Sequence, residues 1–218
     1  MRFLSHVTRV GDPGWPGNPT LAIRPFSLTE RGDVANTYTL HWFNHFGTHM
    51  DAPNHFNPDG PRLAALGPEF FVYRRLYLLD QPLGESELLR PEHLAPHDLA
   101  EVDCLLVRSG FERYRTDDPV AYAERGPGIS SEAASYLMER CPRLKALILD
   151  WISVSAYQKR EDGFRAHRIL AGAEGHGRFV LAVEDATLKE LPATPAWVVA
   201  LPVRVAGIDG GPCTVLAG

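Results

Sequence analysis

Residues 102 to 151 follow the order strand, helix, strand, and this order constrains the fold more than any other feature of the chain. The two outer segments, VDCLLVR at 102 to 108 and KALILDW at 145 to 151, are short, apolar and rich in strand-forming residues. Between them, Ser130 can cap a helix that Pro142 ends. One face of this helix carries Ala133, Ala134, Leu137, Met138 and Cys141. Such a unit joins parallel strands, so we predict a partly parallel sheet covered by helices.

Four further segments have the composition of strands, namely 37 to 42, 71 to 79, 178 to 183 and 196 to 205. Residues 37 to 42 alternate apolar and polar side chains, as expected for a strand with one face buried. Pro202 indicates an edge or a bulge. Turns rich in Pro and Gly separate these segments and allow antiparallel pairing. We therefore predict an α/β fold with mixed β-sheets covered by helices, in a single domain over residues 1–218, because no linker divides the chain.

Charge and cysteine content narrow the function classes. The net charge of -5 argues against binding of nucleic acid through its phosphates, and no stretch is long and apolar enough to cross a membrane. The N-terminus lacks the apolar run of a signal peptide. Cys104, Cys141 and Cys213 form no CxxC pair and are expected to be buried thiols in a reducing compartment. These observations predict a cytoplasmic protein that acts on a small molecule.

Histidines are concentrated in one segment, since four of the nine lie between residues 41 and 55. In HFGTHMDAPNHF, at 45 to 56, the residues His45, His49, Asp51 and His55 are separated by even numbers of positions, so in a straight strand they would share one face. In a straight strand His45 and His49 would stand roughly 13 Å apart, and one metal with bonds near about 2.1 Å could not hold both. The chain must therefore bend, and Gly47 is the residue free to bend it.

Two imidazoles and a carboxylate suit a divalent ion such as zinc or manganese, with positions left for water and substrate. The alternative is a set of polar or core histidines without a ligand. Four histidines and an aspartate around one glycine make that alternative weak. His41 and Trp42 are explained by packing within their strand, and the carboxylate of Asp150, at the end of another strand, either supports a metal ligand or is solvated.

The segment HFGTHMDAPNHF resembles the signature of the cyclase family of metal-dependent hydrolases, which includes bacterial kynurenine formamidase and isatin hydrolase. Other segments resemble the family's motifs in the family's order, so that the likeness covers nearly the whole chain. These segments are PGWPGNP at 13 to 19, LLVRSGF at 105 to 111, GISSEAASYL at 128 to 137, ILDWISVS at 148 to 155, AHRILAG at 166 to 172 and IDGGPC at 208 to 213.

The resemblance implies a role for each matching position. His45, His49 and Asp51 would bind metal, with Asp51 able to bridge two ions, and His167 and Glu184 would complete a two-ion site. His55 would transfer protons, and Trp15 would line the substrate pocket. The family also implies small sheets with covering helices, and a homodimer or larger homo-oligomer. Asn18 stands where the family usually has an aspartate.

Glu184 follows His167 by 17 positions, which is longer than the spacing in the family. The surplus lies in the Gly-rich stretch AGAEGHGR. We expect residues 171 to 177 to form a mobile flap near the pocket mouth, with Glu184 and not Glu174 on the metal, because the glycines around Glu174 cannot hold a ligand firmly.

These features favour a metal-dependent hydrolase that cleaves a small aromatic amide, such as an N-formyl aryl amine of the formylkynurenine type, by attack of metal-activated water. His55 could take a proton from water and give one to the leaving nitrogen. One alternative is an enzyme that opens a lactam or lactone ring, or a cyclase acting on another carbonyl compound. A second is a metal-binding protein without turnover. The sequence leaves open whether one or two ions bind.

Overall fold

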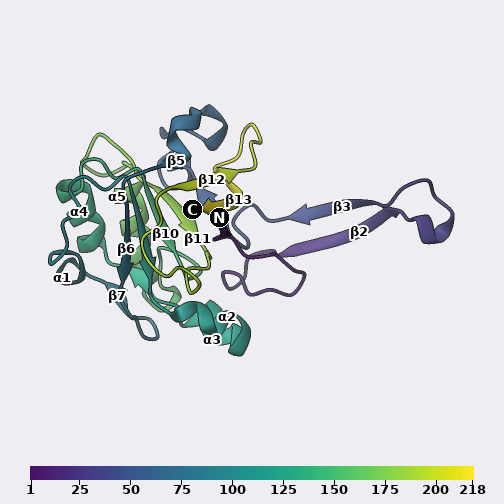
Figure 1. Ribbon diagram of the computed structural model, residues 1–218, viewed down its shortest axis with the longest axis horizontal. Coiled ribbons are helices and arrows are strands. Elements are labelled where there is room, and N and C mark those ends of the chain that lie inside the picture. Colours follow the sequence, from purple (N-terminus) through teal and green to yellow (C-terminus); the bar gives the residue numbers. More distant parts are fainter.

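The computed structural model describes all residues from 1 to 218, which form thirteen strands, five α-helices and six single-turn 3₁₀ helices (Figure 1). The strands are β1 (Arg2–Phe3), β2 (Leu21–Ser27), β3 (Thr37–Trp42), β4 (His49–Asp51), β5 (Val72–Tyr73), β6 (Leu76–Asp80), β7 (Leu88–Leu89), β8 (Cys104–Arg108), β9 (Gly128–Ile129), β10 (Ala146–Leu149), β11 (Leu181–Glu184), β12 (Val198–Pro202) and β13 (Gly210–Ala217). The α-helices are α1 (Pro91–Leu94), α2 (Tyr114–Asp117), α3 (Pro119–Glu124), α4 (Ser131–Arg140) and α5 (Arg160–Leu170). The 3₁₀ helices are Thr29–Arg31, Pro53–His55, Leu63–Ala65, Pro68–Phe70, Phe111–Arg113 and Tyr157–Lys159.

Nine strands form one mixed sheet in the order β5-β12-β13-β4-β11-β10-β8-β6, with β1 paired to β13. The half from β11 to β6 is parallel, and every pair from β11 to β5 is antiparallel. The predicted strand-helix-strand unit is β8-α4-β10, and β8 and β10 are parallel neighbours. Ser130 caps α4 by accepting a hydrogen bond from the Ala133 backbone N–H at 3.1 Å. The prediction of a mixed sheet covered by helices is therefore confirmed.

Both faces of the sheet are buried, so consecutive side chains of its central strands enter two different cores. Leu105 and Leu147 lie in one core with residues of α4 and α5, which pack against each other. Leu106 and Ile148 lie in the other core with residues of β12 and β13. The uninterrupted apolar runs in β8 and β10 follow from this double burial.

The predicted strand at 71 to 79 is wrong as a single element. It is divided into β5 and β6, which lie at opposite ends of the sheet. The Asp103 carboxylate accepts hydrogen bonds from the backbone N–H groups of Arg74 and Arg75, and this turns the chain between the two strands. Strands β1, β2, β4, β7, β9 and β13 are absent from the sequence-based prediction.

The strands β2 and β3 pair only with each other and form an arm that projects from the rest of the molecule (Figure 1). The arm is defined here as residues 21 to 42. Its tip is held by side chains, because Asp33 accepts from the Leu28 N–H and Asn36 accepts from the Thr29 N–H. Every residue of β3 is exposed. Within one chain, the predictions that this strand is half-buried and that packing explains His41 and Trp42 are therefore wrong.

All three cysteines are buried as free thiols, as predicted. None of the helices combines the length and the apolar character needed to cross a lipid bilayer.

Candidate metal centre

The centre of the site is β4, a short buried strand between β11 and β13. His49 and Asp51 are two residues apart and therefore point to the same face of the sheet. Glu184 on β11 is paired directly with His49 in the register. The pairing thus places an imidazole and two carboxylates, from segments far apart in the sequence, at one point of the sheet.

His45 reaches this point because the chain bends at Gly47, as the sequence predicted. Gly47 has a φ of 72°, and a Cβ at this position would lie 2.6 Å from Oγ1 of Thr8. The bend brings the rings of His45 and His49 to a centroid distance of 5.2 Å. Nδ1 of His45 lies 2.8 Å from Oδ1 of Asp51.

His167, in the last turn of α5, faces the carboxylates from the opposite side. Its Nδ1 donates to the Gly163 carbonyl at 2.9 Å, so its Nε2 is directed at the cluster. Nε2 lies 3.4 Å from Oε1 of Glu184 and 3.7 Å from Oδ2 of Asp51. In the same way, the Gly47 carbonyl accepts from Nδ1 of His49 at 2.8 Å and leaves Nε2 of His49 3.2 Å from Oε2 of Glu184.

These side chains have the arrangement of metal ligands. Two triads that share Asp51 have ligand atoms within 4.8 Å of one another, namely His45, His49 and Asp51, and Asp51, His167 and Glu184; a third group at the pocket side, His45, His55 and Asp209, meets the same distance. Asp51 belongs to both triads, and its Oδ2 is buried without a hydrogen-bond partner. A buried, unpaired carboxylate oxygen is costly unless a cation is near it. The residues present therefore fit one or two divalent ions.

The electrostatics of the cluster favour charged carboxylates. Burial and the charge of Asp51 act to raise the pKa of Glu184, but hydrogen bonds from His167 and His49 outweigh them and lower it to about 2. Burial acts to lower the pKa of His45, but Asp51 and Asp209 outweigh it and raise the pKa to about 10. Neighbouring histidines thus lower the pKa of Asp51 and of Glu184 and keep both carboxylates ionised, which is the form of a carboxylate that binds a metal, whereas each histidine must give up its extra proton to become a ligand.

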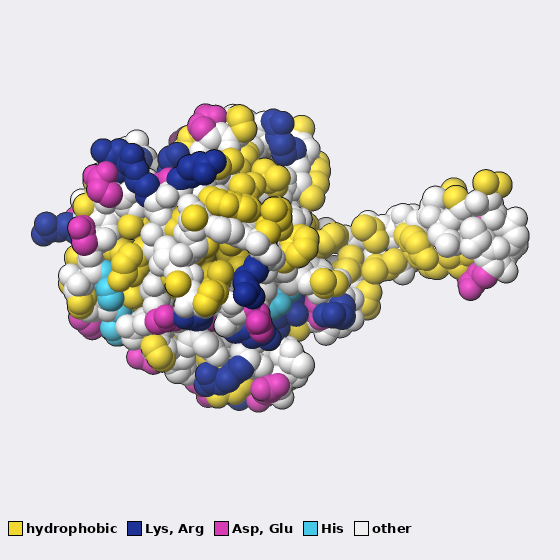
Figure 2. All heavy atoms as spheres, in the orientation of Figure 1, with side chains coloured by type: hydrophobic (Ala, Val, Ile, Leu, Met, Phe, Trp, Pro, Cys, Tyr) yellow, Lys and Arg dark blue, Asp and Glu magenta, His cyan; other side chains and the backbone are white.

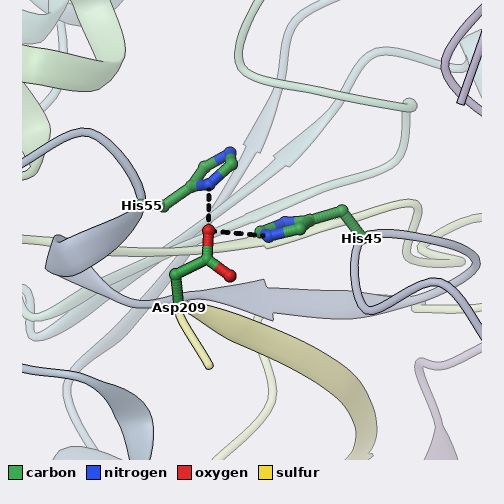
Figure 3. A group of neighbouring side chains, drawn as sticks. All are labelled: His45, His55 and Asp209. Carbon is green, nitrogen blue, oxygen red and sulfur yellow. Dashed lines mark hydrogen bonds and ion pairs between the residues drawn. The ribbon is translucent and has the colours of Figure 1, made fainter. Parts of the chain in front are cut away.

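His55 lies beside the two triads and is paired with Asp209, a residue that the sequence analysis does not single out (Figure 3). Oδ2 of Asp209 lies 2.7 Å from Nδ1 of His55 and 3.3 Å from Nε2 of His45, while Asn44 donates to its Oδ1 at 2.8 Å. Hydrogen bonds from His45 and His55 lower the pKa of Asp209. The ionised Asp209 therefore accepts a hydrogen bond from the Nδ1–H of His55 and leaves Nε2 as the free ring nitrogen.

Asp209 reaches His55 through the pairing of β13 with β4. Gly210 is opposite Asp51 in the register, and the Ala52 N–H donates to the Asp209 carbonyl. A Cβ at Gly210 would lie 2.6 Å from Cε1 of His45, so this position accepts only glycine while His45 stays in place. The motif IDGGPC contains Asp209, but nothing in its spacing relates it to His55.

A pocket opens over the cluster. Its polar lining includes His45, His49, His55, His167 and Glu184. Its rim is largely aromatic and apolar and includes Trp15, Phe43, Phe56, Ile152 and Phe164. Asn18 also lines it. The structure thus brings together every site residue that the sequence predicted, with Trp15 at the rim in edge contact with Tyr157 at 5.3 Å between ring centroids.

The loop 171 to 177 differs from the prediction in its position. None of its residues lines this pocket, and Ala171 borders a small neighbouring cavity that also contacts Asp51 and His167. Glu174 is outside the cluster, because its carboxylate is paired with Arg168 at 2.9 Å and with Arg165 at 3.6 Å. The distinction between Glu174 and Glu184 agrees with the prediction.

Two further buried carboxylates, Asp150 and Asp185, lie outside the ligand triads. Asp150 is buried and accepts from the backbone N–H groups of Ser109 and Gly110 and from the Ser109 hydroxyl. It is therefore neither solvated nor in contact with a metal ligand, the two alternatives that the sequence suggested. Asp185 follows Glu184 with a φ of 52° and accepts from Arg115 and Tyr122. Asp150 thus holds the backbone turn that follows β8, and Asp185 holds the side chains of Arg115 and Tyr122.

Comparisons with known proteins show which family this chain belongs to. The sequence model of the family described as "Putative cyclase" matches residues 3–156. A kynurenine formamidase from Bacillus cereus is 27% identical over 198 residues, which are 91% of this chain and 87% of the relative. An uncharacterized protein from Haemophilus influenzae is 41% identical over 106 residues, which are 48% of this chain and 75% of that protein.

Among solved structures, isatin hydrolase A from Labrenzia aggregata matches with a TM-score of 0.83 at 23% identity. The match covers 99% of this chain and 92% of the isatin hydrolase chain. The likeness is one of fold, and it extends over essentially the whole molecule.

Proposed function

This chain belongs to the cyclase family, and on that premise we propose that it is a metal-dependent hydrolase that cleaves a small aromatic amide of the N-formyl aryl amine type. The observation that carries the proposal is the pair His55–Asp209, which stands beside two metal-ligand triads and inside an open pocket. A site that only stored metal would need no additional histidine with a free ring nitrogen at its rim. The kynurenine formamidase relatives support an amide as the substrate.

In this proposal His45, His49 and Asp51 would hold one zinc or manganese ion, and Asp51, His167 and Glu184 would hold a second if two are bound. When bound, a divalent ion polarises a carbonyl and acidifies water. The hydrogen bonds from Nδ1 of His49 and His167 to backbone carbonyls orient both rings before any ion arrives. Val154 and Ser153 likewise orient Glu184, by donating to its Oε1 at 2.6 and 3.1 Å.

His55 moves the protons. Because Asp209 holds Nδ1, the free Nε2 accepts a proton from the attacking water and returns it to the leaving nitrogen. An amine is a poor leaving group until it is protonated, so the second transfer completes cleavage of the amide bond. The ring of His55 is stacked on that of His45 at a centroid distance of 4.0 Å, which restricts its rotation.

The aromatic rim suits a substrate with an aryl ring. Trp15, Phe43 and Phe164 border the pocket at its apolar side, and the ring of Trp15 is already oriented by its edge contact with Tyr157. An aryl group stacked among them would direct its amide toward the metal ligands.

The test is an assay of the purified chain after metal removal and after reloading with zinc or manganese. N-formyl aryl amines, an aromatic lactam and an aromatic lactone are offered in parallel, and products are identified by mass spectrometry. The proposal expects hydrolysis of the formyl amide that returns with metal. Ring opening alone would favour the lactam or lactone alternative, and tight metal binding without turnover of any substrate would favour a metal-binding protein.

A further inference from the structure

Residues 7 to 18, called the rim loop here, carry Trp15 to the mouth of the pocket. In Figure 1 this loop lies, in purple, between the base of the arm and helices α2 and α3. Its backbone hydrogen bonds all stay within the loop. One polar contact joins it to the rest of the chain, because Nη2 of Arg115 donates to Oδ2 of Asp12 at 3.1 Å. Figure 2 shows acidic, basic and histidine side chains close together below the base of the arm, where this loop lies.

Arg115, on α2, is held firmly at its other side. Its side chain is only 7% exposed, and its Nε and Nη2 donate to the two carboxylate oxygens of Asp185 at 2.9 and 3.1 Å. Asp185 follows Glu184 at the end of β11 and lines the pocket. The planar guanidinium thus bonds two carboxylates at once, which a lysine ammonium cannot do with the same geometry. Arg115 therefore connects the rim loop to the strand that carries Glu184.

The apolar contacts of the rim loop lie on the same network. Trp15 packs against a small buried cluster of Phe111, Tyr122 and Ile152. The hydroxyl of Tyr122 donates to Oδ1 of Asp185 at 2.7 Å. Asp185 consequently holds both the cation that retains the loop and one of the rings beneath Trp15.

We propose that Arg115 is a positioning residue for substrate binding, which holds Trp15 at the pocket through Asp12. Apolar contacts are not directional, so the rings alone would let the loop slide over the cluster. The ion pair fixes the loop three positions before Trp15. An aryl group then meets a ring that is already in place, and the cost of ordering the loop is not added to binding.

This inference rests on the proposed function in one respect, namely that the aryl ring of the substrate contacts Trp15. Arg115 does not line the pocket, and its effect on the substrate is exerted through the loop. A contact of this kind stabilises the bound substrate and the transition state equally. Its loss should therefore raise KM and leave kcat unchanged.

The first test is steady-state kinetics with an N-formyl aryl amine. Asp12→Ala removes the contact and leaves Arg115 paired with Asp185, so KM should rise about 10-fold while kcat and metal content stay within about twofold. Asp12→Glu keeps the charge and should hold KM within about threefold of the wild type. Asp117→Ala is the matched control, because this exposed aspartate of α2 has no ion pair, and it should change neither parameter.

Two further variants separate the loop from a general loss of structure. In a Trp15→Ala background, Asp12→Ala should raise KM no further, because the loop acts through Trp15. Arg115→Lys should raise KM as Asp12→Ala does, because one ammonium cannot reproduce both pairs. Asp12→Ala still decides the proposal if Arg115→Lys fails to fold. A fall in kcat or a loss of metal in Asp12→Ala, with KM unchanged, would overturn the proposal.

The second test needs no substrate. The chain is labelled with 5-fluorotryptophan, and the fluorine resonance of Trp15 is identified by its absence in Trp15→Phe. In Asp12→Ala this resonance should move toward that of a solvated tryptophan, because the ring leaves its edge contact with Tyr157. The resonance of the buried Trp151 should stay in place and report an intact fold.

The two tests distinguish failure of this inference from failure of the proposed function. A Trp15 resonance that does not move in Asp12→Ala would overturn the role of Arg115, whatever the enzyme hydrolyses. A resonance that moves in a chain that hydrolyses no aryl amide would support the holding of the loop and overturn the proposed function.

Discussion

Asp209 determines which ring nitrogen of His55 is free to face the pocket. Its carboxylate accepts from Nδ1 of His55 at 2.7 Å and is itself held by Asn44. A histidine without this partner could rotate and could present either ring nitrogen to the pocket. We therefore regard Asp209 as a positioning residue, whose effect on the reaction is exerted through His55.

Asp209→Asn tests this role. An amide in place of the carboxylate no longer favours a proton on Nδ1, so we expect kcat to fall by about 10 to 100-fold. Metal content and KM should change little, because the substrate does not depend on this contact. The measurement is steady-state kinetics together with metal analysis. A higher KM with an unchanged kcat would show that Asp209 binds substrate instead.

His55→Ala separates metal binding from proton transfer. His55 is outside both ligand triads, so the variant should retain its metal while kcat falls by about 100-fold or more, the scale of a general acid-base group. His55 and His45 also form a possible triad with Asp209, so the metal content of the variant must be measured. A variant that lost its ion would make His55 a ligand and remove it from proton transfer.

Among elements, β11 and the loop before it place two glutamates in different environments. Glu184 is buried in the register beside β4, whereas Glu174 is paired with Arg168 and Arg165 outside the cluster. Glu184→Ala should therefore strip metal and abolish activity, and Glu174→Ala should leave metal content unchanged, as measured by atomic emission. The opposite result would transfer the ligand role to the loop.

The buried carboxylate of Asp150, next to the end of β10, holds the turn that follows the neighbouring strand β8. Asp150→Ala leaves two backbone N–H groups and the Ser109 hydroxyl without their acceptor, and we expect the free energy of unfolding to fall by about 2 to 4 kcal/mol. Chemical denaturation measures the change. Glu139→Ala, on the exposed side of α4, is the matched control and should stay within about 0.5 kcal/mol. Equal effects of the two changes would contradict the role of Asp150.

For the whole molecule, the proposed metal centre joins segments that are distant in the sequence. The candidate ligands come from residue 45, just before the bend at Gly47, and from β4, α5 and β11. An ion that binds only the folded chain stabilises it by about 2.7 kcal/mol at a free concentration of 100 times Kd. We expect chelation to lower Tm and added zinc or manganese to restore it. The Asp51→Ala variant should show no such response, and a response equal to that of the wild type would place the ion elsewhere.

The arm raises a different question at the same scale. Alternation at residues 37 to 42 correctly predicts a strand, and the half-buried position it also predicts is not met within one chain. The expected homo-oligomer remains a prediction.

Local patterns in the sequence were sufficient for several parts of the site and the fold. The spacing in HFGTHMDAPNHF required a bend at Gly47, which the structure has, and the capping signal at Ser130 placed α4. Family motifs supplied His167 and Glu184, which no local spacing relates to His45. The prediction failed at residues 71 to 79, because the turn there depends on Asp103, about 30 positions away.

By itself, then, the sequence determined the mixed α/β architecture and the bend that brings His45 toward His49 and Asp51, and it predicted that these three residues bind metal and that His55 transfers protons. Only the tertiary structure decided that Asp209 lies against His55 and that the apolar face of the arm is uncovered. The physical reason is the range of the interactions. Bends and caps depend on backbone and side chains a few positions apart, whereas the contact between residues 55 and 209 depends on β13 pairing with β4 in one register.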